Sequence, residues 1–138
     1  MKRTFAAVVA ALVTTAAAAA QSYPGDSGAG TERGIEQVNN SGQVGTVTLF
    51  RRDPSTRIQI ALHGVRDGRS ESVRLYRGRS CDDLQPRPTY FLADLRNGLS
   101  RSSVSLTEDR LLSGNYNVVV FSNNHAGAQT VACGHLYQ

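Results

Sequence analysis

The chain has 138 residues, of which 40% are hydrophobic, and its formal net charge is +4. Lys2 and Arg3 lie in an N-terminal segment that we predict to be removed, which lowers the charge by two, to +2, and leaves no lysine. The remaining arginines, such as Arg51 and Arg66, are scattered without a basic run, which is typical of a solvated surface and excludes a nucleic-acid-binding protein.

The N-terminal segment has the pattern of a secretory signal peptide. Lys2 and Arg3 precede an apolar run, and the small residues Ala18 to Ala20 fit a cleavage site before Gln21. The run is shorter than the roughly 20 residues that span a bilayer, so we expect no membrane span in the mature chain. We therefore predict a signal peptide at residues 1–20 and export to the periplasm or the extracellular space. The alternative is that this segment is retained as an anchor helix.

Removal of residues 1–20 leaves about 118 residues, enough for one hydrophobic core and too few for two domains of ordinary size. Residues 21–34 are small, polar and rich in glycine, with no apolar period, and we expect them to form a flexible leader. A single domain is then expected at residues 35–138.

Within this domain, short segments rich in β-branched and aromatic residues alternate with turn signals, a pattern typical of an all-β sandwich or barrel. We expect about eight strands, near residues 35–38, 45–50, 57–62, 72–76, 89–94, 102–106, 116–121 and 130–136. The alternation is clearest in RIQIAL, where Ile58, Ile60 and Leu62 share one face. That face should be core.

The segment at residues 106–112 favours a short helical turn, with Thr107 as the cap before Glu108 and Asp109. Paired acids of this kind are typical of turns and caps.

The chain also has no G-x-S-x-G, H-E-x-x-H or phosphate-binding glycine motif. We therefore predict no catalytic residue and no cofactor.

The two cysteines, Cys81 and Cys133, favour one disulfide bond, because export delivers the chain to an oxidising compartment. In the chain-entropy model this crosslink stabilises the fold by about 4 kcal/mol. Two free thiols with a redox role are the alternative, although the chain has no C-x-x-C motif.

Six segments in chain order carry a family resemblance: NNSGQVGTVTL, IQIALHGV, VRLYRGRSC, PTYFLADLRNGLSRSSVSL, LLSGNYNVVVF and TVACGHL. Together they resemble the copper/zinc superoxide dismutase-like β-sandwich family, and above all its short secreted bacterial members. The resemblance covers about residues 35–136, and its most specific parts are Gly78 to Cys81 and Ala132 to Gly134, whose spacing suits the disulfide of the family. It implies an eight-stranded Greek-key β-sandwich or barrel.

Metal-bearing members of that family carry V-H-x-H on one strand and another V-H late in the chain. The period of two along a strand puts the first two imidazoles on one face, where they converge on copper with the third. In this chain the corresponding positions hold Arg74, Tyr76 and Phe121. A guanidinium group has no lone pair to offer a metal, so the resemblance implies no copper site here.

The zinc loop of the family is also missing. Between Gly78 and Thr89 only Asp82 and Asp83 could bind a cation, and a structural zinc ion needs about four ligands. We therefore predict no metal site in the chain.

The residues at the three ligand positions favour side-chain packing in place of a metal ion. Arg74, Tyr76 and Phe121 would share one neighbourhood, where an arginine can lie on aromatic faces. The alternative is an anion or partner site that adds Arg77 and Arg79, although Arg77 should point to the opposite face from Arg74.

None of the three histidines, His63, His125 and His135, falls on a ligand position of the family, and no pair has H-x-H or H-x-x-x-H spacing. We expect them to be solvated or hydrogen-bonded. The sequence thus favours an exported, non-enzymatic structural or binding module, a pseudoenzyme whose partner it does not name. The alternatives are a dismutase-type enzyme with ligands among these histidines, and an adhesion or inhibitor-like module.

Overall fold

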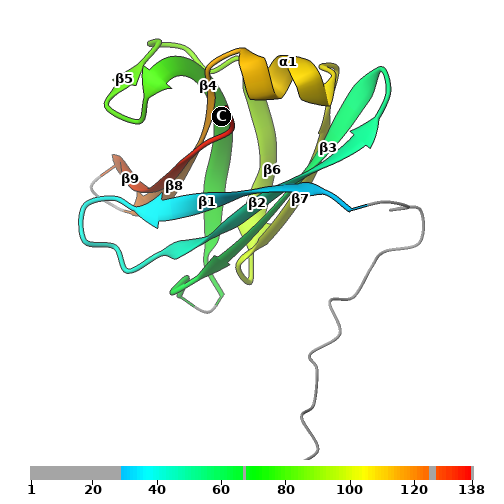
Figure 1. The fold of residues 1–138 in the computed structure, drawn as a ribbon. Coiled ribbons are helices and arrows are strands. Elements are labelled where there is room, and N and C mark those ends of the chain that lie inside the picture. The colour runs from blue at the N-terminus through cyan, green and yellow to red at the C-terminus, as the bar shows by residue number, and fades with distance from the viewer. Residues whose placement is uncertain (1–28, 67, 125–126, 138) are drawn as a thin grey trace, which may run out of the picture.

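The structure, a computed structural model, describes residues 29–66, 68–124 and 127–137 (Figure 1). The predicted signal peptide and most of the predicted leader lie outside these residues. The elements are β1 (Thr31–Gln37), β2 (Val44–Arg52), β3 (Ser55–His63), β4 (Ser70–Ser80), β5 (Asp83–Leu84), β6 (Tyr90–Arg96), β7 (Leu99–Val104), α1 (Glu108–Ser113), β8 (Tyr116–Asn124) and β9 (Gly127–His135). The fold is mostly β, with 64% of the described residues in strands.

The eight long strands form a closed antiparallel barrel. Their order is β4-β6-β7-β3-β2-β1-β9-β8, and β8 then pairs with β4, from Glu71 with Ser122 to Arg77 with Tyr116 (Figure 1). Closure removes the free sheet edges that an open sheet would present. The prediction of an all-β fold with eight strands is confirmed, and the arrangement is a barrel.

Most predicted strands are longer in the structure. β1 begins at Thr31, where Thr31 pairs with Leu49, which corrects the predicted end of the leader at residue 34. The half-buried residues of this half-strand, Thr31 and Arg33, are polar like its exposed ones, so the segment has no apolar alternation. β5 is an additional strand that pairs only with β4. There the backbone of Asp83 approaches so closely that a Cβ on Gly78 would lie 2.3 Å from its carbonyl oxygen.

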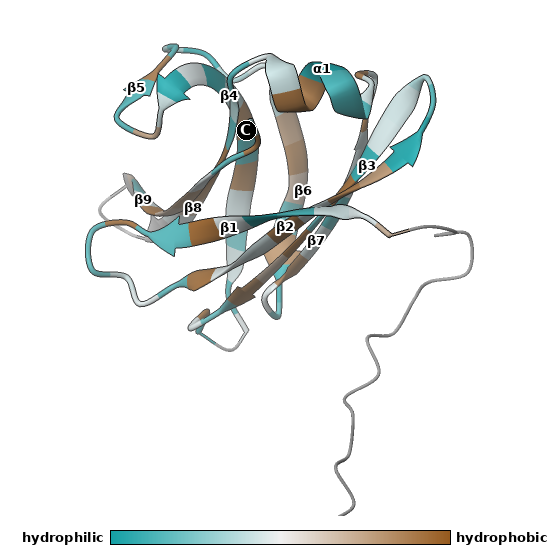
Figure 2. Cartoon of the chain, in the orientation of Figure 1, coloured by the Kyte–Doolittle hydropathy of each residue, from teal (hydrophilic) through white to brown (hydrophobic). Residues whose placement is uncertain are grey.

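The barrel interior is apolar because alternate residues of each strand point inward. Ile58, Ile60 and Leu62 are 1%, 0% and 6% exposed, whereas their neighbours Gln59 and Ala61 are half-buried, which confirms the predicted core face of β3. Figure 2 shows the same alternation as hydrophobic bands between hydrophilic ones along the strands.

Helix α1 closes one end of the barrel (Figure 1). The side chain of Thr107 accepts a hydrogen bond from the backbone N–H of Arg110 at 3.4 Å, so the predicted cap is confirmed. Leu111 is fully buried in the core cluster and joins the helix to the barrel.

The seam between β6 and β7 is held partly by side chains. After the turn at Asn97-Gly98, where both residues have positive φ, the strands share the pair of Arg96 with Leu99. Farther along, Ser100 Oγ donates to the carbonyl oxygen of Ala93 at 2.6 Å. The N–H of Ala93 donates to Ser102 Oγ at 2.7 Å, so two serine hydroxyls take the place of backbone partners.

Candidate functional site

Arg74 and Tyr76, which the sequence resemblance aligns with metal-ligand positions, lie on the outer face of β4. Val73 and Leu75 point into the core and are 1% and 0% exposed, so Arg74 and Tyr76 point outward. Arg74 lies opposite Phe91 of β6 on one side and Val119 of β8 on the other. The strand period therefore places Arg74 and Tyr76 on one face, as predicted.

Arg74 lies between two aromatic rings. Its guanidinium carbon is 5.0 Å from the ring centre of Phe121 and 5.4 Å from that of Phe91. Its Nε atom is buried and has no hydrogen-bond partner among the described residues, which fits stacking on rings. Such contacts stabilise by about 0.5–2 kcal/mol each, depending on exposure. We call Arg74, Phe91 and Phe121 the arginine patch.

Sequence reasoning missed Phe91. Its side chain is 75% exposed, next to Leu92, which is 7% exposed. The alternation in YFLADL places Phe91 outward once Leu92 is assigned to the core, so the strand period alone could have found it.

Beside the arginine patch lies a second apolar cluster outside the barrel wall, which we call the outer cluster. Tyr76, Val119 and Cys133 form its buried centre, with exposures of 8%, 1% and 4%. Phe121 and Leu84 pack against it. The rings of Tyr76 and Phe121 are 6.2 Å apart between centroids and inclined by 58°, so the outer cluster and the arginine patch are continuous.

The two cysteines hold this cluster together. Their sulfur atoms, in Cys81 and Cys133, lie at disulfide-bonding distance, 2.01 Å, with Cα atoms 6.1 Å apart. The crosslink joins the segment that contains β5 to β9 and encloses the outer cluster. The predicted pairing agrees with this geometry.

A polar network borders the cluster. Asn117 is fully buried; its Nδ2 donates to the carbonyl oxygen of Gly78 at 2.9 Å, and its Oδ1 is hydrogen-bonded to Nδ1 of His135. Tyr137 donates from its hydroxyl to the carbonyl oxygen of Arg79. These contacts fix the bulged end of β4 against β9 and the C-terminal residues.

Arg77 does not join the arginine patch. Its guanidinium carbon lies 5.6 Å from the ring centre of Tyr116, a residue of the interior cluster. The structure therefore separates Arg77 from Arg74, as the strand period predicts.

The histidines lie apart from the patch. His63 is exposed at the end of β3, and His135 makes the hydrogen bond to Asn117. His125 lies outside the described residues. Within the described ranges, no three histidine, cysteine or acidic side chains are grouped so that they could share a metal ion. Asp82 lies in a turn, where its N–H donates to Ser80 Oγ at 3.2 Å.

A groove of about 660 Å³ runs beside the disulfide. Both signs of charge line it, from Arg33, Glu36 and Asp82, and His135 borders it. The groove adjoins the outer cluster on the side of β1 and does not include the arginine patch.

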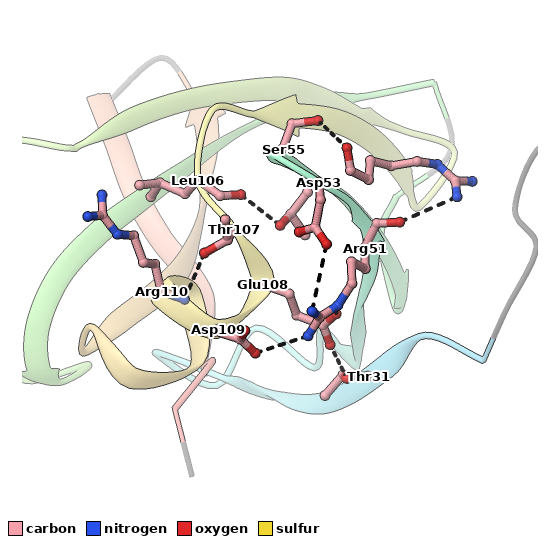
Figure 3. Close-up of polar contacts among 11 residues, drawn as sticks. Thr31, Arg51, Asp53, Ser55, Leu106, Thr107, Glu108, Asp109 and Arg110 are labelled. Carbon is pink, nitrogen blue, oxygen red and sulfur yellow. Dashed lines mark hydrogen bonds and ion pairs between the residues drawn. The ribbon is translucent and has the colours of Figure 1, made fainter.

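A separate ion-pair cluster ties β2 to α1 (Figure 3). Arg51 lies 3.0 Å from Asp109, 3.4 Å from Glu108 and 3.8 Å from Asp53 between charged atoms. Asp109, and after it Asp53, raises the pKa of Arg51 above its ordinary value. Thr31 donates from its hydroxyl to Glu108, which is only 8% exposed.

This cluster corrects two sequence interpretations. Arg51 is half-exposed but ion-paired, so it is more than part of a solvated face, and Glu108 is a buried partner as well as a first-turn residue. Arg51 and Glu108 are 57 positions apart in the chain, so no local sequence pattern indicates their contact, which forms only in the folded protein.

In the described part of the chain, no helix has the length and hydrophobicity to cross a membrane. Comparisons of the chain with family models, curated proteins and solved structures found no match in any of the three.

Proposed function

We propose that this protein is an exported, non-enzymatic structural or binding module, related in fold to the copper/zinc superoxide dismutase-like family, in which side-chain packing stands in place of the metal centre. The proposal combines the resemblance of the six sequence segments with the geometry of the outer face of β4.

The strand order supports the fold relationship. Apart from the two-residue β5, strands β4, β6 and β7 follow one another in the chain and lie side by side, and β8 returns to lie beside β4. A fourth strand that returns beside the first of three consecutive strands is the pattern of a Greek key. The connection from β3 to β4 also joins strands that are not neighbours, since β3 pairs with β7 and β2.

The position of Arg74 is the observation that carries the proposal. At 5.0 Å from the Phe121 ring, its guanidinium group occupies the neighbourhood in which the resemblance expects three imidazoles. A copper ion there would lie beside a fixed cation, and two unit charges 4 Å apart repel by about 4 kcal/mol at an effective dielectric constant of 20. Packing and charge therefore both oppose a metal at this place.

The arginine patch also supports a binding role. Phe91 leaves 75% of its surface exposed while one face contacts Arg74. Arginine and aromatic side chains are enriched in protein interfaces, where they carry much of the binding energy. We infer that the arginine patch is the contact surface of the module.

The test is metal uptake by the purified mature protein after dialysis against copper and zinc, with a dismutase assay on the same sample. We expect no stoichiometric copper and no dismutase activity above that of free metal in buffer. The triple variant R74H/Y76H/F121H tests whether the position accepts imidazoles, and Arg77→His, on the other side of β4, is its matched control.

Tight binding of one copper ion by the unaltered protein, abolished by Tyr76→Phe, would overturn the proposal and favour a dismutase-type enzyme. Copper uptake by the triple variant, with none by the unaltered protein or by Arg77→His, would support it.

A further inference from the structure

A second, polar cavity lies at the end of the barrel opposite α1. Tyr116, which begins β8, follows α1, whereas Glu71 pairs with Ser122 at the far end of the same strand. The cavity has a volume of about 220 Å³ and is lined by Gln43 and Glu71, among others. It shares no residue with the arginine patch, so a ligand in this cavity would be independent of the proposed function.

Two buried side chains of this cavity form an incomplete hydrogen-bond network. Glu71 and Gln43 are only 4% and 6% exposed, and Gln43 Nε2 donates to Glu71 Oε1 at 2.7 Å. This bond fixes the orientation of the amide, because a carboxylate accepts hydrogen bonds and cannot donate them. One acceptor then remains on each side chain.

These acceptors, Glu71 Oε2 and Gln43 Oε1, are buried and have no hydrogen-bond partner among the described residues. Burial without a partner costs free energy, and more so when the group is charged. The pair therefore calls for a donor that has more than one N–H group and carries positive charge. A protonated primary amine meets both requirements.

A divalent metal ion fits the cavity less well. Calcium takes six to eight oxygen ligands, usually with several carboxylates. Here Glu71 is the single acidic side chain among the described residues that line the cavity, and Arg66 and Arg69 line it as well. Two guanidinium groups close to the site would repel a divalent cation.

Arg66 and Arg69 are suited to bind an anionic group of a ligand. They flank the turn between β3 and β4, where the N–H of Arg69 donates to the carbonyl oxygen of Arg66 at 3.3 Å and Gly68 has a φ of 74°. Both side chains are exposed, and neither forms an ion pair with a described residue. Guanidinium groups bind carboxylates through paired hydrogen bonds.

We propose that this cavity binds a small zwitterion of the amino-acid type, with its ammonium group on Glu71 and Gln43 and its carboxylate on Arg66 and Arg69. The buried wall is anionic and the exposed wall is cationic, which matches the two ends of such a molecule. A volume of about 220 Å³ is large enough for a small amino acid.

Calorimetric titration of the full mature chain tests this with three probes at equal ionic strength: glycine, methylammonium chloride and sodium acetate. We expect saturable binding of glycine, weaker binding of methylammonium and the weakest binding of acetate. Glu71→Gln should weaken glycine binding by about tenfold or more, the usual loss for a charged hydrogen bond, while the exposed Glu36→Gln is the matched control.

The double variant R66Q/R69Q changes only exposed side chains, so it provides the test if the Glu71→Gln variant does not fold. It should weaken glycine binding without weakening methylammonium binding, because the arginines would hold only the carboxylate and repel a cation. No saturable binding of glycine or methylammonium by the unaltered protein would overturn the proposal, because water would then satisfy the two oxygens. Acetate binding as strong as glycine binding would also overturn it, because the arginines alone would then make the site.

Discussion

Arg74 of β4 lies directly opposite Phe91 of β6, and its guanidinium carbon is 5.4 Å from the centre of a ring that is 75% exposed. An arginine held against an exposed ring has already lost part of its side-chain entropy, so the partner contact proposed above would cost less of it.

The two phenylalanines of the arginine patch should differ in their effect on stability. Phe91→Ala removes one exposed contact and should lower the free energy of unfolding by less than about 1 kcal/mol. Phe121→Ala also opens the outer cluster and should cost about 2–4 kcal/mol. Urea denaturation of the two variants measures the difference, and equal losses would mean that Phe121 does not pack against Tyr76.

The disulfide should contribute strongly to stability. It joins residues 52 positions apart, and a loop of that length gives about 4 kcal/mol in the chain-entropy model. The double variant C81S/C133S should therefore melt at least several degrees below the unaltered protein, and it leaves no odd thiol to form dimers. Thiol titration of the unreduced, unfolded protein gives the independent check: two free thiols would refute the crosslink.

The register of β3 gives a paired prediction. Ile60 is fully buried and points into the barrel, so Ile60→Ala should cost about 2–5 kcal/mol. Gln59, on the outer face, accepts a hydrogen bond from Arg101 at 3.3 Å, and Gln59→Ala should cost less than about 1 kcal/mol. Thermal denaturation that showed equal sensitivity at the two positions would contradict the inward orientation of Ile60.

The ion-pair cluster of Arg51 should make stability depend on salt. Arg51→Gln leaves the buried carboxylate of Glu108 without its cation, so it should lower the urea midpoint more than Arg87→Gln, a matched change at an exposed arginine. The difference should shrink in 1 M NaCl, where charges are screened over about 3 Å. A difference that did not change with salt would assign the effect to packing of the side chain.

The pKa of Arg51 is raised in the folded state, chiefly by Asp109. The contribution of its charge is therefore fully present below the ordinary pKa of arginine and is lost only as the pH rises through the raised value. Across the neutral range, the effect of Arg51→Gln should not change through titration of Arg51 itself.

Features encoded locally could be predicted from the sequence. The two-residue period of RIQIAL gives the buried face of β3, and Thr107 before two acids gives the cap of α1. Both depend on backbone geometry over a few residues, which side-chain patterns report directly.

Features made by contacts between distant strands could not be predicted in this way. The bond between Gln43 and Glu71 and the ion pair of Arg51 with Glu108 join polar residues that are ordinary in their own segments. Barrel closure through β4 and β8 is of the same kind, because neither strand carries a signal for its second partner. The placement of Arg74 against Phe121 could be inferred only through the family resemblance.

The hydrogen bonds that serine hydroxyls make between β6 and β7 can be removed by single amino-acid substitutions. Elsewhere a ladder hydrogen bond joins main-chain atoms that nearly every residue type supplies, so most codon changes cannot remove it. Ser100 and Ser102 supply two such bonds from their side chains. Single substitutions to alanine there would therefore loosen the wall without removing an apolar group from the interior, and natural variation at these two codons could set how readily this seam opens.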